Sequence, residues 1–231
     1  MAFKLLVWDF DGTIADTLPA AVTIFNRLAP EMGFKPLEDV NAARGMPTRE
    51  LMRKHGVTFW RLPKLVRRYQ AAVAEEADQL KLIAGMAELL AACQTAGVRQ
   101  GILSSNREDN IRRCLRANGA EQNFAFIIGY PRLFGKSKAL KRIIRAQNKR
   151  GFWTRLRAIP KAEKLNRDEV LYIGDELRDV EAAKKVGVKV AAVTWGFHTA
   201  ELLRSGRPDF VVSDARELLD LVKAEPTRAA G

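Results

Sequence analysis

Short apolar runs alternate with longer helical patterns through most of this chain, and this alternation constrains the fold more than any other feature. Each apolar run is bounded by turn-forming residues, which is typical of a buried strand. The predicted strands lie at residues 3–8, 98–103, 124–129, 170–173, 188–193 and 209–212. The predicted helices that follow or separate them lie at residues 86–96, 107–118, 137–149, 179–186 and 214–223. Strands that alternate with helices form a parallel sheet covered on both faces, so we predict an α/β fold.

A long helical region interrupts this alternation after the first strand. Helical patterns at residues 17–33, 48–55 and 62–80 follow one another without a strand between them. We therefore predict an α/β core formed by residues 1–16 and 81–231, with a helical insert at residues 17–80.

The composition agrees with a globular enzyme-sized domain. With 231 residues, of which 47% are hydrophobic, the chain can bury a core without disulfide bonds or a structural metal. Only two cysteines occur, Cys93 and Cys114, which excludes a disulfide scaffold and a four-ligand zinc site. No apolar run approaches the roughly 18 residues of a membrane span, and residues 1–9 do not read as a signal peptide. We therefore expect a cytoplasmic protein without a transmembrane segment.

Polar side chains follow three of the predicted strands. Asp9 follows the first strand, Ser104, Ser105 and Asn106 follow the second, and Asp175 follows the fourth. In open parallel sheets, ligands bind outside the carboxyl ends of the strands. We therefore expect these side chains to meet at one edge of the sheet and to form a site there.

Two carboxylates directly follow the first strand, at Asp9 and Asp11. Carboxylates two residues apart can share a hard cation, and Gly12 permits a tight turn that lets a ligand approach. The alternative is an ordinary glycine-containing turn with solvated carboxylates. The polar strand ends further along the chain argue against that alternative.

The segment at residues 9–13, Asp-Phe-Asp-Gly-Thr, resembles the first motif of the haloacid dehalogenase superfamily in its phosphatase form. The segments at 102–106, 134–137 and 172–179 are similar to the later motifs of that family, in the same order. Residues 193–197 and 208–209 look like the C-terminal part of phosphoglycolate-phosphatase-type members. The resemblance extends from about residue 3 to 220. It implies a Rossmann-like core, and it implies that the insert at 17–80 is a mobile helical cap.

The resemblance also implies a mechanism. Asp9 would attack phosphorus and form an aspartyl phosphate. Mg²⁺ would be held by the side chains of Asp9 and Asp175 and by the backbone carbonyl of residue 11. The Asp11 carboxyl would then protonate the leaving group and later deprotonate a water molecule. Dehalogenases of the superfamily lack this second aspartate, so its presence favours a phosphate ester over a carbon–halogen bond.

A hydroxyl group and a lysine complete the catalytic set that the resemblance implies. Ser104 is expected to bind a phosphoryl oxygen, with Ser105 as the alternative. Lys136 is expected to neutralise the nucleophile and the phosphoryl group. The proline that commonly follows this lysine in the family is absent, and Lys138 is an alternative. The competing interpretations are a strand-end turn hydroxyl and a solvated lysine at the start of a helix.

Four residues are further candidates for contacts with the substrate, namely Thr13, Ser105, Asn106 and Arg44. Arg44 lies between predicted cap helices, and similar Arg-Gly segments in the family face the active site. The alternative for Arg44 is a surface arginine.

Asp179 lies four residues after Asp175, which is one turn of a helix. It could hold the lysine or a metal-bound water, and the alternative is a solvent-facing carboxylate. We expect Glu176 and Arg178 to be structural. The two histidines, His55 and His198, have no partners at ligand-type spacing, so neither receives a role.

The positive charge is concentrated in one segment. The chain carries a formal net charge of +12, and residues 136–167 contain twelve basic residues and one acidic residue. Residues 145–167 read as a basic elaboration of the core. A solvated basic face is one interpretation, and a docking surface for an anionic partner, nucleic acid or acidic protein, is another.

These observations predict a Mg²⁺-dependent phosphatase that acts on a small phosphorylated metabolite. Phosphoglycolate is the substrate that the resemblance suggests. The alternatives are a phosphomutase of the same fold, which would use the same Asp9 and Asp11, and a nucleic-acid-binding protein that uses residues 136–167.

Overall fold

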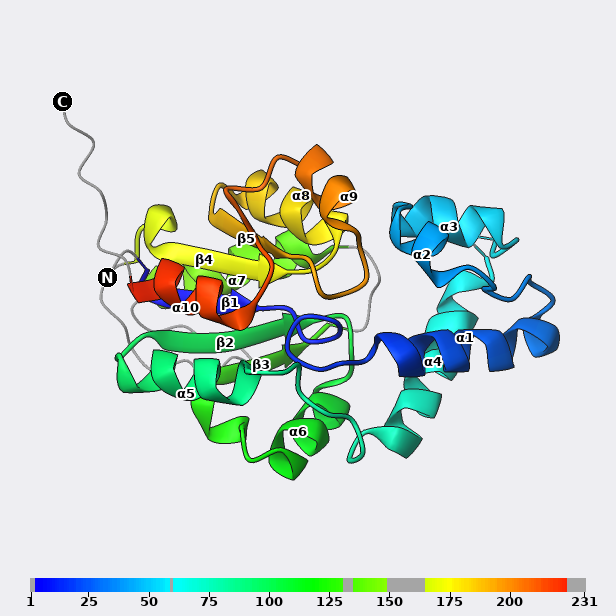
Figure 1. The fold of residues 1–231 in the computed structure, drawn as a ribbon, viewed down its shortest axis with the longest axis horizontal. Coiled ribbons are helices and arrows are strands. Elements are labelled where there is room, and N and C mark those ends of the chain that lie inside the picture. Colours follow the sequence, from blue (N-terminus) through cyan, green and yellow to red (C-terminus); the bar gives the residue numbers. More distant parts are fainter. Residues whose placement is uncertain (1–2, 59, 131–134, 149–164, 224–231) are drawn as a thin grey trace.

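The computed structural model describes residues 3–58, 60–130, 135–148 and 165–223 and contains a six-stranded, fully parallel sheet (Figure 1). The strand order is β3-β2-β1-β4-β5-β6, so the chain starts in the middle of the sheet and extends it in both directions. The strands are β1 (Leu5–Trp8), β2 (Arg99–Ser104), β3 (Phe126–Gly129), β4 (Val170–Gly174), β5 (Lys189–Val193) and β6 (Phe210–Val212). The predicted α/β, Rossmann-like fold is therefore confirmed.

Helices cover both faces of this sheet. On one face lie α5 (Met86–Thr95), α6 (Glu108–Ala117) and α10 (Ala215–Lys223), and on the other lie α7 (Lys136–Asn148), α8 (Leu177–Val186) and α9 (Ala200–Ser205). The short 3₁₀ helices η1 (Glu121–Asn123) and η2 (Arg167–Glu169) lead into β3 and β4. Figure 1 shows α8 and α9 on one side of the strands and α5 and α6 on the other.

The central strand β1 shows why the sheet needs both helical layers. Successive side chains of a strand point to opposite faces. Leu5 and Val7 pack into the core beneath α7 and α8, whereas Leu6 and Trp8 pack into the core beneath α5 and α6. All four side chains are fully buried. An apolar run without alternating polar residues therefore specifies a strand that is covered on both faces.

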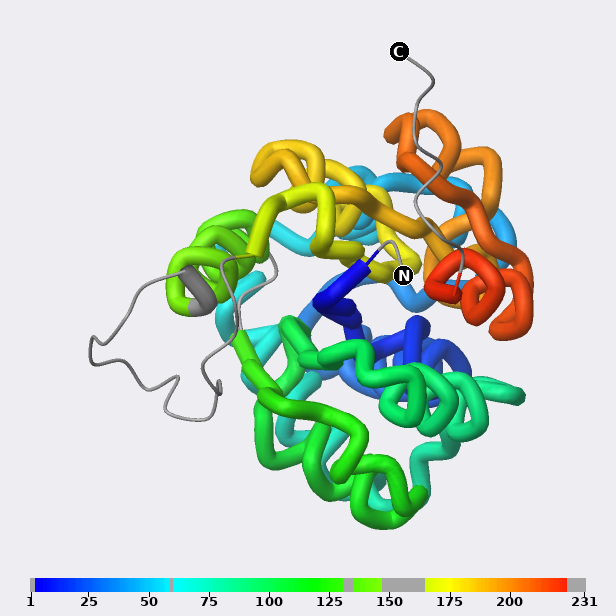
Figure 2. The backbone as a smooth tube through the Cα atoms, turned by 90° about the vertical axis from the view of Figure 1, so that its left-hand side faces the viewer, coloured from blue at the N-terminus to red at the C-terminus, as the bar shows by residue number. Residues whose placement is uncertain are grey.

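Four helices form the insert that follows β1. They are α1 (Leu18–Met32), α2 (Val40–Arg44), α3 (Thr48–Lys54) and α4 (Leu62–Glu76). The insert lies beyond one end of the strands in Figure 1 and behind the core in Figure 2.

The two chain segments that join the insert to the core pair with each other. The Asp16 backbone amide donates to the Lys81 carbonyl at 2.9 Å, and the Ile83 amide donates to the Ile14 carbonyl at 2.9 Å. An antiparallel bridge joins Ala15 and Leu82 between them. Both connections therefore form one short two-stranded strap.

The predicted strands are all present, with ends that differ by at most two residues. The helices α2 and α9 were not predicted, because helices of five and six residues contain too few turns for a periodic pattern. Their N-caps are Asp39, which accepts from the Ala42 amide at 2.9 Å, and Thr199, which accepts from the Leu202 amide at 3.3 Å. The predicted helix at 62–80 ends earlier, at Glu76. Among the residues described, no helix has the length and apolar character needed to cross a bilayer.

The sheet centre should dominate the stability of the core. Ile102 in β2 is fully buried, whereas Ile128 in the edge strand β3 is half-buried. We expect Ile102→Ala to lower the free energy of unfolding by about 2–5 kcal/mol, because it leaves a cavity. Ile128→Ala is the matched control and should cost clearly less. Urea denaturation measures both, and equal losses would contradict this account of the core.

Candidate active site

The carboxyl end of β1 leads into a tight loop that positions two aspartates. Asp9 directly follows β1, is buried, and accepts a hydrogen bond from the Phe10 amide at 2.7 Å. The Phe10 carbonyl in turn accepts from the amides of Ile14 and Ala15 at 2.9 and 3.0 Å. Gly12 has a φ of 71°, a left-handed conformation that glycine adopts without steric cost. The loop therefore turns back at once and leaves both carboxyl groups at the sheet edge.

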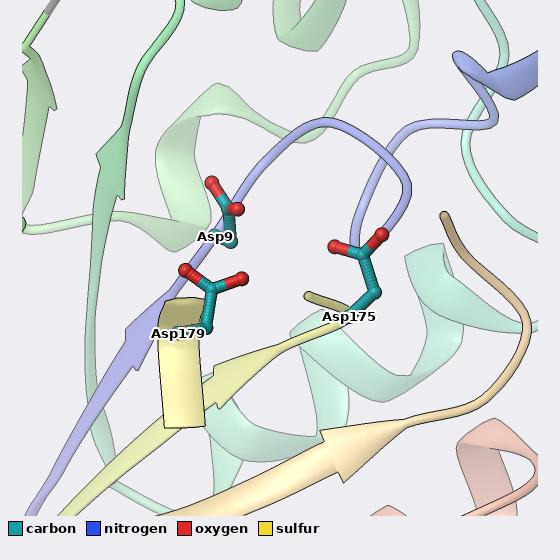
Figure 3. Close-up of side chains that lie close together, drawn as sticks. All are labelled: Asp9, Asp175 and Asp179. Atoms are coloured by element: carbon teal, nitrogen blue, oxygen red, sulfur yellow. The ribbon is translucent and has the colours of Figure 1, made fainter. Parts of the chain in front are cut away.

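Three buried carboxylates come together at this edge. One oxygen from each of Asp9, Asp175 and Asp179 lies within 4.8 Å of the others, and Figure 3 shows Asp9 next to Asp179 with Asp175 nearby. Asp175 follows β4, and Asp179 lies in the first turn of α8. The parallel register of β1 and β4 sets these two strand ends side by side, with Trp8 opposite Ile173.

A buried lysine contacts two of these carboxylates. Lys136, at the start of α7, donates from Nζ to Asp9 and to Asp179, the latter at 2.7 Å. Lys138, the alternative lysine, is exposed. Between these two lysines, the structure therefore brings Lys136 to the cluster. Asp179 also accepts from the Glu176 amide at 3.2 Å, which closes the N-terminus of α8.

The cluster has more negative than positive charge at its centre. Burial raises the pKa of Asp9 to about 7, although Lys136 acts in the opposite direction. Burial, followed by the charge of Asp9, raises the pKa of Asp175 well above its ordinary range. Buried carboxylates of this kind are stable as anions when a cation is shared between them. The donors are all oxygens, which is the set that a hard divalent cation prefers, so the residues fit such an ion.

Asp175 is held on both of its oxygens. The Thr13 hydroxyl donates to Oδ1 at 2.6 Å, and the Phe197 amide donates to Oδ2 at 2.6 Å. Gly196 permits this approach, since a Cβ there would lie 2.2 Å from Asp175 Oδ2 and 2.4 Å from the Gly12 carbonyl oxygen. The loop after β5 is therefore part of the site.

The Asp11 carboxyl is turned toward the end of β2. It accepts from Asn106 Nδ2 at 3.2 Å and from Ser104 Oγ at 3.4 Å. Burial raises the pKa of Asp11, and the hydrogen bond from Asn106 opposes this shift. A carboxyl group with a raised pKa is suited to donating a proton.

A cavity of about 200 Å³ separates this edge of the sheet from the helical insert. Asp11, Ser105 and Asn106 line it on the core side, and side chains of α1, α2, α3 and α4 line it on the other. The Gln70 side chain of α4 donates to the Ser105 carbonyl at 3.0 Å. The site therefore lies where the insert meets the core.

Known proteins are similar to this chain in sequence and in fold. The family model for haloacid dehalogenase-like hydrolases matches residues 6–193. The chain belongs to this family. It is 33% identical over 221 residues to a phosphoglycolate phosphatase of Synechococcus elongatus, with 95% of this chain and 97% of the relative covered.

Two further matches agree with this family. An N-acetylmuramic acid 6-phosphate phosphatase of Pseudomonas putida is 25% identical, with 96% of this chain and 97% of the relative covered. The crystal structure of a predicted phosphatase from Clostridium acetobutylicum superposes with a TM-score of 0.77 at 19% identity, with 96% of this chain and 99% of that chain covered. The structural match shows the shared fold.

Two residues expected to contact the substrate or its phosphoryl group, Thr13 and Ser104, have hydroxyl groups that bind other side chains of the site. Thr13 is fully buried and its hydroxyl donates to Asp175, and the substrate contact expected of this residue stays a prediction. Ser104 is likewise fully buried, with its hydroxyl near Asp11, whereas Ser105 lines the cavity. A strand end alone does not reveal which of two adjacent hydroxyls turns outward.

Arg44 lines the cavity, but its guanidinium binds the core. Its Nε donates to the Gly196 carbonyl at 3.0 Å, and its Nη2 donates to the Thr194 carbonyl at 3.1 Å. The Thr48 hydroxyl also donates a hydrogen bond from the insert to the core, to Glu176 Oε2 at 2.7 Å. These contacts join the insert to the loops that follow β4 and β5.

Three residues that sequence reasoning set aside lie at the site. The buried Glu176 and the half-buried Arg178 form an ion pair that lines the cavity, and His198 lines it beside them and accepts from the Leu177 amide at 2.9 Å. The expectation that Glu176 and Arg178 are structural stays a prediction, and their ion pair lies at the cavity. Their place at the cavity could have been predicted from their position after the fourth strand, because the site of this fold lies at the strand ends.

The basic segment at 136–167 is described only in part. Residues 149–164, which make up most of the predicted elaboration at 145–167, lie outside the described residues. Lys136 is buried and paired with two carboxylates, so its charge does not contribute to a basic surface.

The Thr13 hydroxyl should matter for metal binding because it orients Asp175. We expect Thr13→Val, which keeps the shape and removes the hydroxyl, to weaken Mg²⁺ binding roughly 10- to 100-fold. Thr13→Ser keeps the donor and should lose much less. Calorimetric titration with Mg²⁺ measures the dissociation constants, and equal values for Thr13→Val and the unaltered protein would contradict this role.

Proposed function

We propose that this phosphatase of the haloacid dehalogenase-like family hydrolyses a small phosphate monoester in two steps, with Asp9 as nucleophile and Asp11 as general acid and base. One observation carries the proposal: the two carboxyl groups lie on one loop but have different partners. Asp9 lies against Lys136, and Asp11 borders the cavity and accepts from Asn106. Two carboxyl groups in different environments are suited to different roles.

The first step needs a nucleophile and charge neutralisation. A phosphate monoester is anionic and hydrolyses extremely slowly in water. Asp9 would attack phosphorus and form an aspartyl phosphate, while the ester oxygen leaves. When bound, Mg²⁺ would offset the repulsion between the two anions. Its ligands would be the side chains of Asp9 and Asp175 and the backbone carbonyl of residue 11.

Asp11 would move the protons of both steps. In the first step its carboxyl donates a proton to the departing oxygen and yields the alcohol. In the second step its carboxylate takes a proton from water, whose oxygen attacks phosphorus and releases Asp9 and inorganic phosphate. The raised pKa of Asp11 supports the first role.

Lys136 would offset charge on Asp9 and on the transferring group, and Asp179 would keep the lysine in position. The ion pair between Lys136 and Asp179 at 2.7 Å supports this assignment. Ser104, Ser105 and Asn106 would supply hydrogen bonds at the end of β2. We assign residues 17–80 as the cap that excludes water from the site.

The relative from Synechococcus elongatus makes phosphoglycolate the first metabolite to test. At lower identity, the chain is also similar to a phosphatase named for a different substrate, the N-acetylmuramic acid 6-phosphate phosphatase. We therefore propose the reaction, hydrolysis of a phosphate monoester, and its mechanism. Phosphoglycolate is the substrate that the resemblance favours.

Asp9→Asn tests the nucleophile. We expect Mg²⁺-dependent hydrolysis of 4-nitrophenyl phosphate by the unaltered protein and a loss of more than about a thousandfold in the variant, because an amide does not attack phosphorus. Release of 4-nitrophenolate, with and without Mg²⁺, measures the rates. Activity of the variant within tenfold of the unaltered protein would sink the assignment.

Asp11→Asn tests the acid separately. We expect roughly a 10²- to 10⁴-fold loss with an alkyl phosphate, whose departing oxygen needs a proton. The loss should be much smaller for the first step with 4-nitrophenyl phosphate, because 4-nitrophenolate leaves without protonation. Single-turnover measurements compare the two esters, and equal losses would show that Asp11 does not protonate the leaving group.

A further inference from the structure

The cavity between insert and core has two chemically different parts. Its core side carries the polar groups of Asp11, Ser105 and Asn106. The side toward the insert is mostly apolar and is lined from all four helices of the insert by side chains that include Val22, Phe25, Val40, Leu51, Leu62 and Val66. Arg44, Thr48, Tyr69 and Gln70 are polar members of the lining on this side.

These six apolar side chains are only partly buried, although they point toward the interior of the insert. Helix α3 contains no fully buried residue at all. In a packed helical core such side chains fill the space between helices to near-crystalline density. Here they surround open volume instead, and an apolar cavity favours an apolar occupant.

The basic side chains that line this cavity are already engaged. Within the described part of the chain they are Arg44, Arg178 and His198. Arg44 donates to two core carbonyls, Arg178 pairs with Glu176, and His198 accepts from a backbone amide. The described charged side chains of the lining are the basic Arg44 and Arg178 and the acidic Asp11 and Glu176, so the lining offers no excess of positive charge to a second anionic group on the substrate.

Asp11 connects the apolar space to the reaction. Under the proposed function, on which this inference rests, Asp11 protonates the oxygen that leaves with the alcohol. Asp11 borders the cavity, so the alcohol part of the substrate extends from Asp11 into the insert. An apolar cavity of about 150 Å³ binds benzene, so a cavity of about 200 Å³ suits a hydrocarbon part of about six carbons.

We propose that the substrate is the phosphate monoester of a neutral, apolar alcohol of about six carbons, whose hydrocarbon part occupies the cavity lined by the insert. The phosphate remains at the carboxylate cluster, and the alcohol body contacts α1, α2, α3 and α4. This class differs from phosphoglycolate, which carries a carboxylate where the cavity is apolar.

A series of primary alkyl phosphates tests this class, since their departing oxygens have similar basicity. With Mg²⁺ present, kcat/KM should rise about two- to fourfold for each added methylene from ethyl to hexyl phosphate, in line with the transfer free energy of a buried methylene. Phosphoglycolate should have a lower kcat/KM than butyl phosphate. A flat series, or phosphoglycolate as the best substrate, would overturn the proposal.

A cavity-filling variant and a matched control locate the effect. Val66→Phe fills part of the cavity, and Arg67→Phe places the same side chain at the next, exposed position of α4. The ratio of kcat/KM for hexyl over ethyl phosphate should fall at least fivefold in Val66→Phe and stay within twofold of the unaltered ratio in Arg67→Phe. Equal ratios in the two variants would contradict the placement of the alcohol.

Binding of phosphonates separates this inference from the activity itself. Hexylphosphonate, ethylphosphonate and phosphonoacetate have a carbon–phosphorus bond that the proposed reaction does not cleave. We expect hexylphosphonate to bind at least tenfold more tightly than ethylphosphonate and phosphonoacetate in calorimetric titrations with Mg²⁺ present. Tight, selective binding without turnover of any ester would refute the proposed hydrolysis and leave the apolar specificity standing. Turnover with tighter binding of phosphonoacetate would refute the apolar specificity alone.

Discussion

The contact of Lys136 with Asp9 and Asp179 is the interaction on which the rest of the site depends. It ties the end of β1 to the first turns of α7 and α8, three elements far apart in the sequence. A lone charge so deeply buried would be strongly destabilising. Mutual pairing makes the burial tolerable, but the cluster has three carboxylates and Lys136 pairs with only Asp9 and Asp179. The remaining negative charge is what a divalent cation would balance, so stability and chemistry rest on the same groups.

The sheet fixes the positions of the aspartates that form this cluster. Asp9 and Asp175 follow adjacent strands whose register is fixed by hydrogen bonds along their whole length. Side chains on rigid elements hold their geometry better than side chains on free loops. The short loops after β1 and β5 then add only local adjustments: Thr13 and Phe197 each bind one oxygen of Asp175.

The strands and the general position of the site were predictable from sequence because both depend on local patterns. Apolar runs define the buried strands, and the residues that follow them define the edge where Asp9, Asp11 and Asp175 meet. Side-chain direction was not predictable. Thr13 and Arg44 contact groups more than 140 residues away in sequence, and only the folded arrangement decides these partners. His198 was overlooked for the same reason, since its neighbours come from α8 and not from its own segment.

The paired strap at residues 14–16 and 81–83 separates the core, which carries the carboxylate cluster, from the insert, which lines most of the cavity. Among the described residues, the three carboxylates and the side chains of Lys136 and Thr13 that bind them lie outside residues 17–80, whereas most of the apolar wall of the cavity lies inside that range. Because the two connections are bonded to each other, the insert can change in sequence or length without altering the strands that carry the aspartates. Substitutions in the apolar wall can therefore change recognition while the aspartates keep their positions, whereas Arg44, Thr48 and Gln70 also bind the core.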